Sequence, residues 1–118
     1  MLARMRKSHL SVTIIYVRGE QFVELSAMVG RTPFEVSDNG NVLHQFESRD
    51  YLITAADLVL GSAVTLPQPG DLITEVINGV TCYYQVLSQT GAPCYRYTDG
   101  SCIELRIHTK KIPTPPGD

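Results

Sequence analysis

The chain lacks several features that mark common classes of protein. Tryptophan is absent, and charged residues make up only 19% of the sequence, with a net charge of −2. No apolar run approaches the roughly 20 residues that a membrane-spanning helix needs. The basic residues near the N terminus are not followed by the apolar block of an export signal, and the net charge does not favour a grip on nucleic acid. We therefore expect no membrane association and no export signal.

Cysteine is scarce and its spacing is uninformative for metal binding. The three residues, Cys82, Cys94 and Cys102, form no Cys-x-x-Cys pair, the spacing on which structural zinc sites depend. A zinc site made from these three and His108 is therefore disfavoured. An odd number of cysteines also argues against a secreted disulfide scaffold. We expect reduced thiols in a reducing cytoplasm, packed as small apolar side chains.

Catalytic motifs are missing as well. There is no Gly-x-Ser-x-Gly elbow and no glycine-rich phosphate loop. Three acids are candidates for an acidic site: Asp50, Asp57 and Asp71. Each also has a simpler structural role, because Asp50 and Asp71 are expected in turns and Asp57 in the cap of a helical turn. The three histidines are far apart in the sequence and are expected at the surface or at strand edges: His9, His44 and His108. We expect no enzyme, no metal and no cofactor.

The sequence does contain many short alternating segments rich in β-branched residues, which are typical of strands. The expected strands cover residues 10–17, 21–28, 32–36, 42–53, 72–77, 80–88 and 103–109. A helix is an alternative for 21–28, and Gly30 is expected to end that segment. One short helical turn near residues 54–60 is expected, capped by Thr54 and held by Leu58 and Leu60. Seven or eight short antiparallel strands predict an all-β fold, a small single-domain barrel or sandwich.

The segment from Leu66 to Ile73 and the hairpin after it are the clearest local signal. Asn78-Gly79 lies between two apolar runs, which is typical of a type I′ turn. Asp71 is expected to fold its side chain back onto local backbone N–H groups. The two-residue turn places Ile77 opposite Val80, Glu75 opposite Cys82 and Ile73 opposite Tyr84. The face expected toward the core carries Ile73, Ile77, Val80, Cys82, Tyr84 and Val86, with Glu75 as a misfit near a rim.

The last strand has the cleanest alternation. Its expected inward residues are Ile103, Leu105 and Ile107, and its expected outward residues are Glu104, Arg106 and His108. Lys110-Lys111 and the prolines after them are not expected to continue a central strand. Residues 89–100, between the hairpin and this last strand, are expected to form a polar loop. The domain organisation expected is a basic flexible arm at residues 1–9, a β-barrel domain at 10–112 and a proline-rich flexible tail at 113–118.

One group of aromatic and basic residues is of the kind that binds single-stranded nucleic acid. It consists of Tyr83, Tyr84, Tyr95, Arg96, Tyr97 and Arg106. The alternative is that these tyrosines cover the rim of the core with their hydroxyls in water, which we favour. A small β-barrel binding module for nucleic acid or a peptide therefore remains the alternative function.

The order of features resembles the head–tail joining proteins of long-tailed bacteriophages, also called head-completion or stopper proteins. The resemblance covers residues 46–112 and rests on four segments: Arg49-Asp50-Tyr51-Leu52-Ile53, Pro69-Gly70-Asp71-Leu72-Ile73, Tyr83-Tyr84-Gln85-Val86-Leu87 and the strand from Ile103 to Thr109. It implies a mostly β structural protein of the virion. Copies would form a ring below the portal that extends the DNA channel and docks the tail. The implied partners are the protein itself, a portal or adaptor protein, a tail protein and genomic DNA that passes without sequence-specific binding.

Overall fold

The computed structural model describes residues 11–38, 41–87 and 93–113, and the side chains of 34–46 are left out of the description. The expected basic arm at 1–9 and most of the expected tail at 113–118 lie outside these residues. The elements are β1 (Ser11–Arg18), β2 (Gln21–Asp38), β3 (Asn41–Thr54), the 3₁₀ turn η1 (Ala55–Asp57), β4 (Val59–Leu60), β5 (Ala63–Val64), β6 (Leu72–Ile77), β7 (Val80–Val86), β8 (Tyr95–Tyr97) and β9 (Glu104–Ile112).

The fold is an all-β barrel, as the alternation predicts. Neighbouring strands pair antiparallel in the order β3-β2-β1-β6-β7-β9, and β9 pairs with β3 to close the ring of six strands. β8 adds to β9, while β4 and β5 form a small separate hairpin. Closure satisfies the backbone groups of the strands that take part in it, so the barrel itself has no open edge along those pairings. Among the described residues, no helix has the length and apolar character that crossing a membrane requires.

The barrel interior follows the period-two alternation of the strands. From β1, the buried side chains are Ile14 and Tyr16. β2 is a strand, as predicted, and not the alternative helix. η1 lies where the helical turn was predicted, and Leu58 and Leu60 are buried in the core. The Thr54 side chain makes no capping hydrogen bond, so the predicted cap is wrong; with a turn of three residues, there is little helix to cap.

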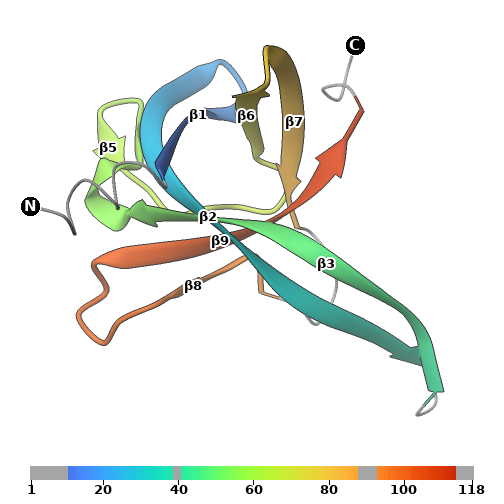
Figure 1. The fold of residues 1–118 in the computed structure, drawn as a ribbon. Helices are drawn as coiled ribbons and strands as arrows, with labels where there is room; N and C mark the ends of the chain where they lie inside the picture. The colour runs from blue at the N-terminus through green and yellow to red at the C-terminus, as the bar shows by residue number, and fades with distance from the viewer. Residues whose placement is uncertain (1–10, 39–40, 88–92, 114–118) are drawn as a thin grey trace, which may run out of the picture.

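β2 and β3 are longer than predicted. Gly30 was expected to end the second strand, yet β2 continues through it to Asp38 and includes the segment predicted as a separate strand. In this part of β2, Phe34 lies opposite Phe46 of β3. Beyond the barrel, residues 32–38 and 41–48 pair only with each other among the described strands, and they project as a two-stranded ribbon (Figure 1). We call this ribbon the β2–β3 arm.

The hairpin of β6 and β7 has the predicted register, with Glu75 opposite Cys82 and Ile73 opposite Tyr84. Asn78 and Gly79 both have positive φ, as a type I′ turn requires. Val80, however, is exposed and does not reach the core, because the end of the hairpin extends past the core cluster.

β7 and β8 lie end to end along one edge of β9, while β3 pairs with the other edge. Part of the predicted polar loop is therefore strand β8. β7 ends at Val86, and Tyr95 to Tyr97 pair with the next part of the same edge of β9. The rest of the expected loop includes residues 89–92, which are not described. β9 itself continues through Lys110 and Lys111, contrary to the prediction, because these two residues pair with β7.

Two residues of the last strand differ from their predicted orientation or exposure. Leu105 and Ile107 are buried as predicted, but Ile103 is 60% exposed. Ile103 precedes β9 and follows Cys102, whose positive φ breaks the strand geometry, so the alternation does not extend to it. His108 is on the outer side of the strand, yet it is buried against Asp50, so the predicted surface histidine is wrong.

Candidate assembly surfaces and the networks behind them

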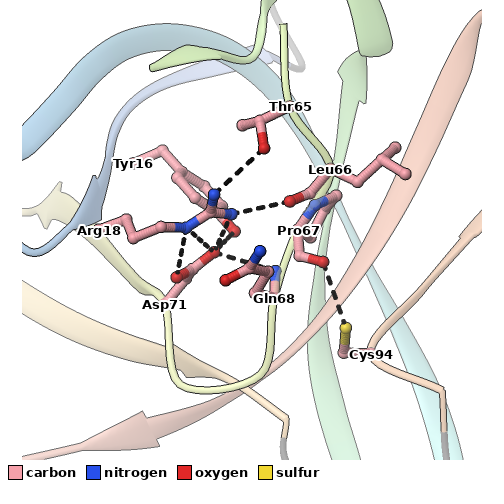
Figure 2. A network of polar contacts seen from close by, with 8 residues as sticks. All are labelled: Tyr16, Arg18, Thr65, Leu66, Pro67, Gln68, Asp71 and Cys94. Carbon is pink, nitrogen blue, oxygen red and sulfur yellow. Dashed lines mark hydrogen bonds and ion pairs between the residues drawn. The ribbon is translucent and has the colours of Figure 1, made fainter. Parts of the chain in front are cut away.

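Three buried carboxylates organise the polar interior, and each is paired with an arginine. Asp71 is the first of them. The Arg18 guanidinium binds it as a fork, with Nε 3.0 Å from Oδ1 and Nη2 2.8 Å from Oδ2. The Tyr16 hydroxyl and the Gln68 backbone N–H also donate to Oδ2 (Figure 2). The predicted fold-back of Asp71 onto local backbone is therefore correct, and its contacts with β1 add a long-range role.

The same arginine holds the connection between β5 and β6 against the barrel. Arg18 donates to the Thr65 hydroxyl (3.1 Å) and to the Leu66 carbonyl (2.7 Å), and the Cys94 thiol reaches the Pro67 carbonyl at 3.8 Å (Figure 2). Burial raises the pKa of the Cys94 thiol, so it stays protonated and unreactive. The segment before β6 is thus fixed by side chains from β1 and from the approach to β8.

Asp50 is the second carboxylate, and its side chain is fully buried on the outer face of β3 and β9. Ser48 and His108 contact Oδ1, while Thr32 and Arg106 contact Oδ2. Burial alone would raise the pKa of Asp50, but these four hydrogen bonds outweigh it and hold the pKa well below the usual range. Asp50 is therefore ionised, and since a carboxylate only accepts, the His108 Nδ1 donates to it. The predicted role of Asp50 as a turn residue is wrong.

Glu75 is the third carboxylate. It was expected near a rim, but it is buried inside the barrel. Arg49 Nη2 lies 2.8 Å and the Tyr51 hydroxyl 2.7 Å from its Oε1. The Arg49 guanidinium also lies over the rings of Tyr51 and Tyr84, at 5.5 and 5.2 Å from their centroids. Among the described residues, every buried side-chain nitrogen and oxygen has a hydrogen-bond partner, and fully satisfied polar networks of this kind make a core rigid.

The surface offers unpartnered apolar area instead. On the outer face of β1 and β6, Ile15 is 38% exposed and Val76 64% exposed. They border an open hollow that is also lined by Val12, Thr13, Glu24 and Thr74. Large apolar side chains exposed around a hollow are typical of a protein contact surface. We call this region the β1–β6 face.

Other exposed apolar residues lie on separate elements. Phe22 is exposed just after the β1–β2 turn, Val64 is exposed on β5, and Leu66 is exposed after it. The β2–β3 arm adds two strand edges that no other described strand covers. Uncovered strand edges are a feature that soluble monomers usually avoid, so the edges of the arm indicate contacts with other chains. Apolar side chains exposed singly on separate elements are ordinary in soluble proteins and do not by themselves indicate a contact.

The structure separates the residues that the sequence suggested as sites. Asp50 and Asp71 belong to different networks, and Asp57 is exposed on η1. The described residues contain no group of three His, Cys, Asp or Glu side chains that could hold a metal ion. Cys82 and Cys94 are buried free thiols, and Cys102 is exposed. His9 lies outside the described residues, as does the side chain of His44.

The aromatic and basic group is not assembled into one face either. Tyr84 is buried in the barrel, and Arg106 is bound to Asp50. Tyr95 and Tyr97 are half-buried against the core, in edge-to-face contact with centroids 6.1 Å apart, with exposed Arg96 between them. Tyr95 and Tyr97 therefore lie at the rim of the core, as the favoured alternative expects, whereas Tyr84 does not.

Sequence reasoning did not find the three arginines as partners of buried acids. The signal available was Glu75, a charged residue at an inward position of a strand, together with tyrosines at the inward positions 16 and 51. Both kinds of residue need a polar partner when buried. The partners themselves come from strands far apart in sequence, which no local pattern reveals.

Comparison with known proteins identifies a family. The model of the family described as phage head-tail joining protein matches residues 1–116, nearly the whole chain. No curated protein and no solved structure gives a significant match.

Proposed function

Because the chain belongs to the phage head–tail joining protein family, we propose that its copies form a ring below the portal of the phage head. The ring extends the DNA channel and docks the tail. The partners proposed are other copies of the chain, a portal or adaptor protein, and a tail protein. The genome passes through without sequence-specific contacts, and the protein is part of the virion.

The observation that carries this proposal is the contrast between a closed, internally satisfied barrel and its unpartnered exterior. Three arginine–carboxylate pairs fix the interior, while the β1–β6 face and the β2–β3 arm present apolar side chains and strand edges outward. In a ring, each subunit uses two different surfaces to contact its two neighbours. A stiff subunit with several separate contact surfaces fits that requirement.

A structural role without catalysis also fits a group of described residues that resembles a hydrolase triad in composition. Ser48, Asp50 and His108 are close together, but Ser48 donates to Asp50 and not to a ring nitrogen of His108. A nucleophilic serine needs the histidine as its base. Here the carboxylate uses all its contacts to hold strands together, so we propose that the protein is not an enzyme.

The alternative function, a barrel that binds nucleic acid or a peptide, has less support. Its candidate residues are dispersed between the core, the rim and the Asp50 network. The net charge of −2 suits a channel through which DNA must slide, since dense Lys and Arg would hold the phosphates.

The proposal is tested with Val76→Asp, which places a charge on the β1–β6 face. Val64→Asp is the matched control, because Val64 on β5 is equally exposed (63% against 64%) and lies on another element. Each variant is supplied to phage that lack the gene, and particles are counted by electron microscopy. We expect the wild-type protein at the portal vertex, a loss of tailed particles of at least tenfold with Val76→Asp, and nearly normal particles with Val64→Asp.

Two results would contradict the proposal or part of it. A wild-type protein that stays monomeric in the presence of heads and never appears in particles would overturn the ring. Normal assembly with Val76→Asp, or an equal loss with both variants, would show that the β1–β6 face is not the specific contact.

A further inference from the structure

The β2–β3 arm needs a device that sets its direction. Residues 32–38 and 41–48 are paired only with each other among the described strands, and they project well beyond the barrel (Figure 1). An isolated two-stranded hairpin is at best marginally stable in water and has no neighbours to orient it. The direction of this arm therefore depends on the contacts at its root, where β2 and β3 leave the barrel.

The Asp50 network lies at that root and links three strands. Arg106 extends from β9 across β3, where its Nε is 2.6 Å from Asp50 Oδ2, and reaches β2, where its Nη2 is 3.0 Å from the carbonyl oxygen of Arg31. Thr32, the next residue of β2, donates to the same carboxylate. One guanidinium and one carboxylate thus connect the first residues of the arm to the barrel.

Gly30 makes room for this connection. A Cβ atom built on Gly30 would lie 2.8 Å from Arg106 Nη2, which is closer than real Cβ contacts. Gly30 has no positive φ to explain it, so its backbone conformation does not require glycine. Its position opposite Asp50 in the β2–β3 register instead leaves the space that the guanidinium occupies.

The pair is built to hold one geometry. Asp50 is fully buried and the Arg106 side chain only 19% exposed, so neither charge can turn to water without leaving the other unpaired. Charge-assisted hydrogen bonds are short and directional, and here they fix the arginine fork against both strands. His108 from β9 and Ser48 from β3 occupy the second carboxylate oxygen and prevent it from rotating.

We propose that Asp50 and Arg106 are positioning residues that clamp the β2–β3 arm at one angle to the barrel. The clamp sets where the arm presents its open edges to a neighbouring chain in the head–tail joint. This inference rests on the proposed function for its role in assembly, but the clamp itself is a property of the isolated subunit.

The test measures the direction of the arm directly. Spin labels are attached at Gln45→Cys, a position along β3 in the arm, and at Val80→Cys on the exposed end of the β6–β7 hairpin. Cys102→Ser removes the exposed native thiol, and the buried Cys82 and Cys94 stay unlabelled. The width of the distance distribution between the labels, measured by double electron–electron resonance, reports how fixed the arm is.

Asp50→Asn and Gly30→Val are made in this labelled protein, with Asp71→Asn as the matched control. Asp71 is also a buried carboxylate paired with an arginine, but it holds the segment before β6 and not the arm. We expect both root variants to broaden the distribution at least twofold while circular dichroism still shows a folded barrel. The control should keep the narrow wild-type distribution even where it lowers the denaturation midpoint.

Unchanged widths in both root variants would overturn the clamp, as would equal broadening with Asp71→Asn. If Gly30→Val does not fold, Arg106→Gln takes its place. Normal tail attachment by a variant with a broadened arm would overturn the role of the clamp in assembly while leaving the proposed ring intact. Failure of the wild type to assemble would instead count against the proposed function alone, because the label distances come from the isolated protein.

Discussion

At the scale of single residues, this barrel uses arginine to hold each buried acid. Arg18, Arg49 and Arg106 pair with Asp71, Glu75 and Asp50 respectively. Such pairs add little net stability compared with an apolar core, but removing one partner costs about 3–5 kcal/mol, because the other charge is left buried and alone. Their effect is to fix geometry, which a subunit of a ring needs.

Asp50 also makes stability depend on pH in a defined direction. Its folded pKa is depressed relative to the unfolded value of about 3.9. Its contribution is therefore fully present above that value and is lost as pH falls toward the folded pKa, because the unfolded chain then binds the proton first. We expect Asp50→Asn to unfold more easily than the wild type at pH 7, by about 3 kcal/mol. The difference should shrink as pH falls from 5 to 2.

Denaturant titrations at several pH values measure this difference. Asp57→Asn, which removes the same charge from the exposed η1 turn, is the control and should change the free energy of unfolding at pH 7 by less than about 0.5 kcal/mol. If the difference in free energy of unfolding between Asp50→Asn and the wild type stays constant down to pH 2, this would contradict the ionised, hydrogen-bonded state of Asp50.

At the scale of the elements, local sequence signals located the turns better than the ends of strands. Asn78-Gly79 forms the predicted hairpin because few residues other than Asn and Gly accept the positive φ that this turn needs. The prediction that Gly30 ends the second strand is wrong, although glycine often does end a strand. Here it remains within β2, since its missing side chain gives space to Arg106 from another strand.

The turn gives an element-scale prediction. Gly79 has φ +80 and no atom near its absent side chain, so Gly79→Ala introduces backbone strain without a clash. We expect a loss of about 1–2 kcal/mol in the free energy of unfolding. Gly100→Ala is the control, because that position is equally open but lacks a positive φ, and it should be neutral or slightly stabilising. Thermal and denaturant unfolding compare the two, and equal losses would contradict the proposed cause.

At the scale of the whole molecule, closure of the barrel decides which residues are inside. β9 pairs with both β3 and β7 and so completes the ring of six strands. Ile107 in its centre is fully buried, whereas Ile103, four residues earlier, lies outside the closed region. The sequence pattern treats the two isoleucines alike. They differ in the structure because Ile107 lies within the closed part of β9, whereas Ile103 precedes β9 and follows the positive φ of Cys102.

Truncating each isoleucine tests this distinction. Ile107→Ala leaves a cavity in the core and should lower the free energy of unfolding by about 3–4 kcal/mol. Ile103→Ala removes exposed atoms only and should change it by less than about 0.5 kcal/mol. Denaturant titration of both variants, with circular dichroism as the signal, is sufficient. Similar losses for the two would mean that Ile103 packs into the core after all.

The amino-acid sequence by itself determined the all-β class, the register of the β6–β7 hairpin and the inward positions of Leu105 and Ile107, because these follow from alternation and turn chemistry between near neighbours. Its four motif segments also pointed to the head–tail joining family. Tertiary structure alone decided the closure by β9, the length of the arm and the burial of Glu75 and His108. Those features depend on pairings between residues far apart in the chain, such as Arg106 with Asp50 and Arg18 with Asp71, and a buried charge finds its partner only when the strands that carry both are already side by side.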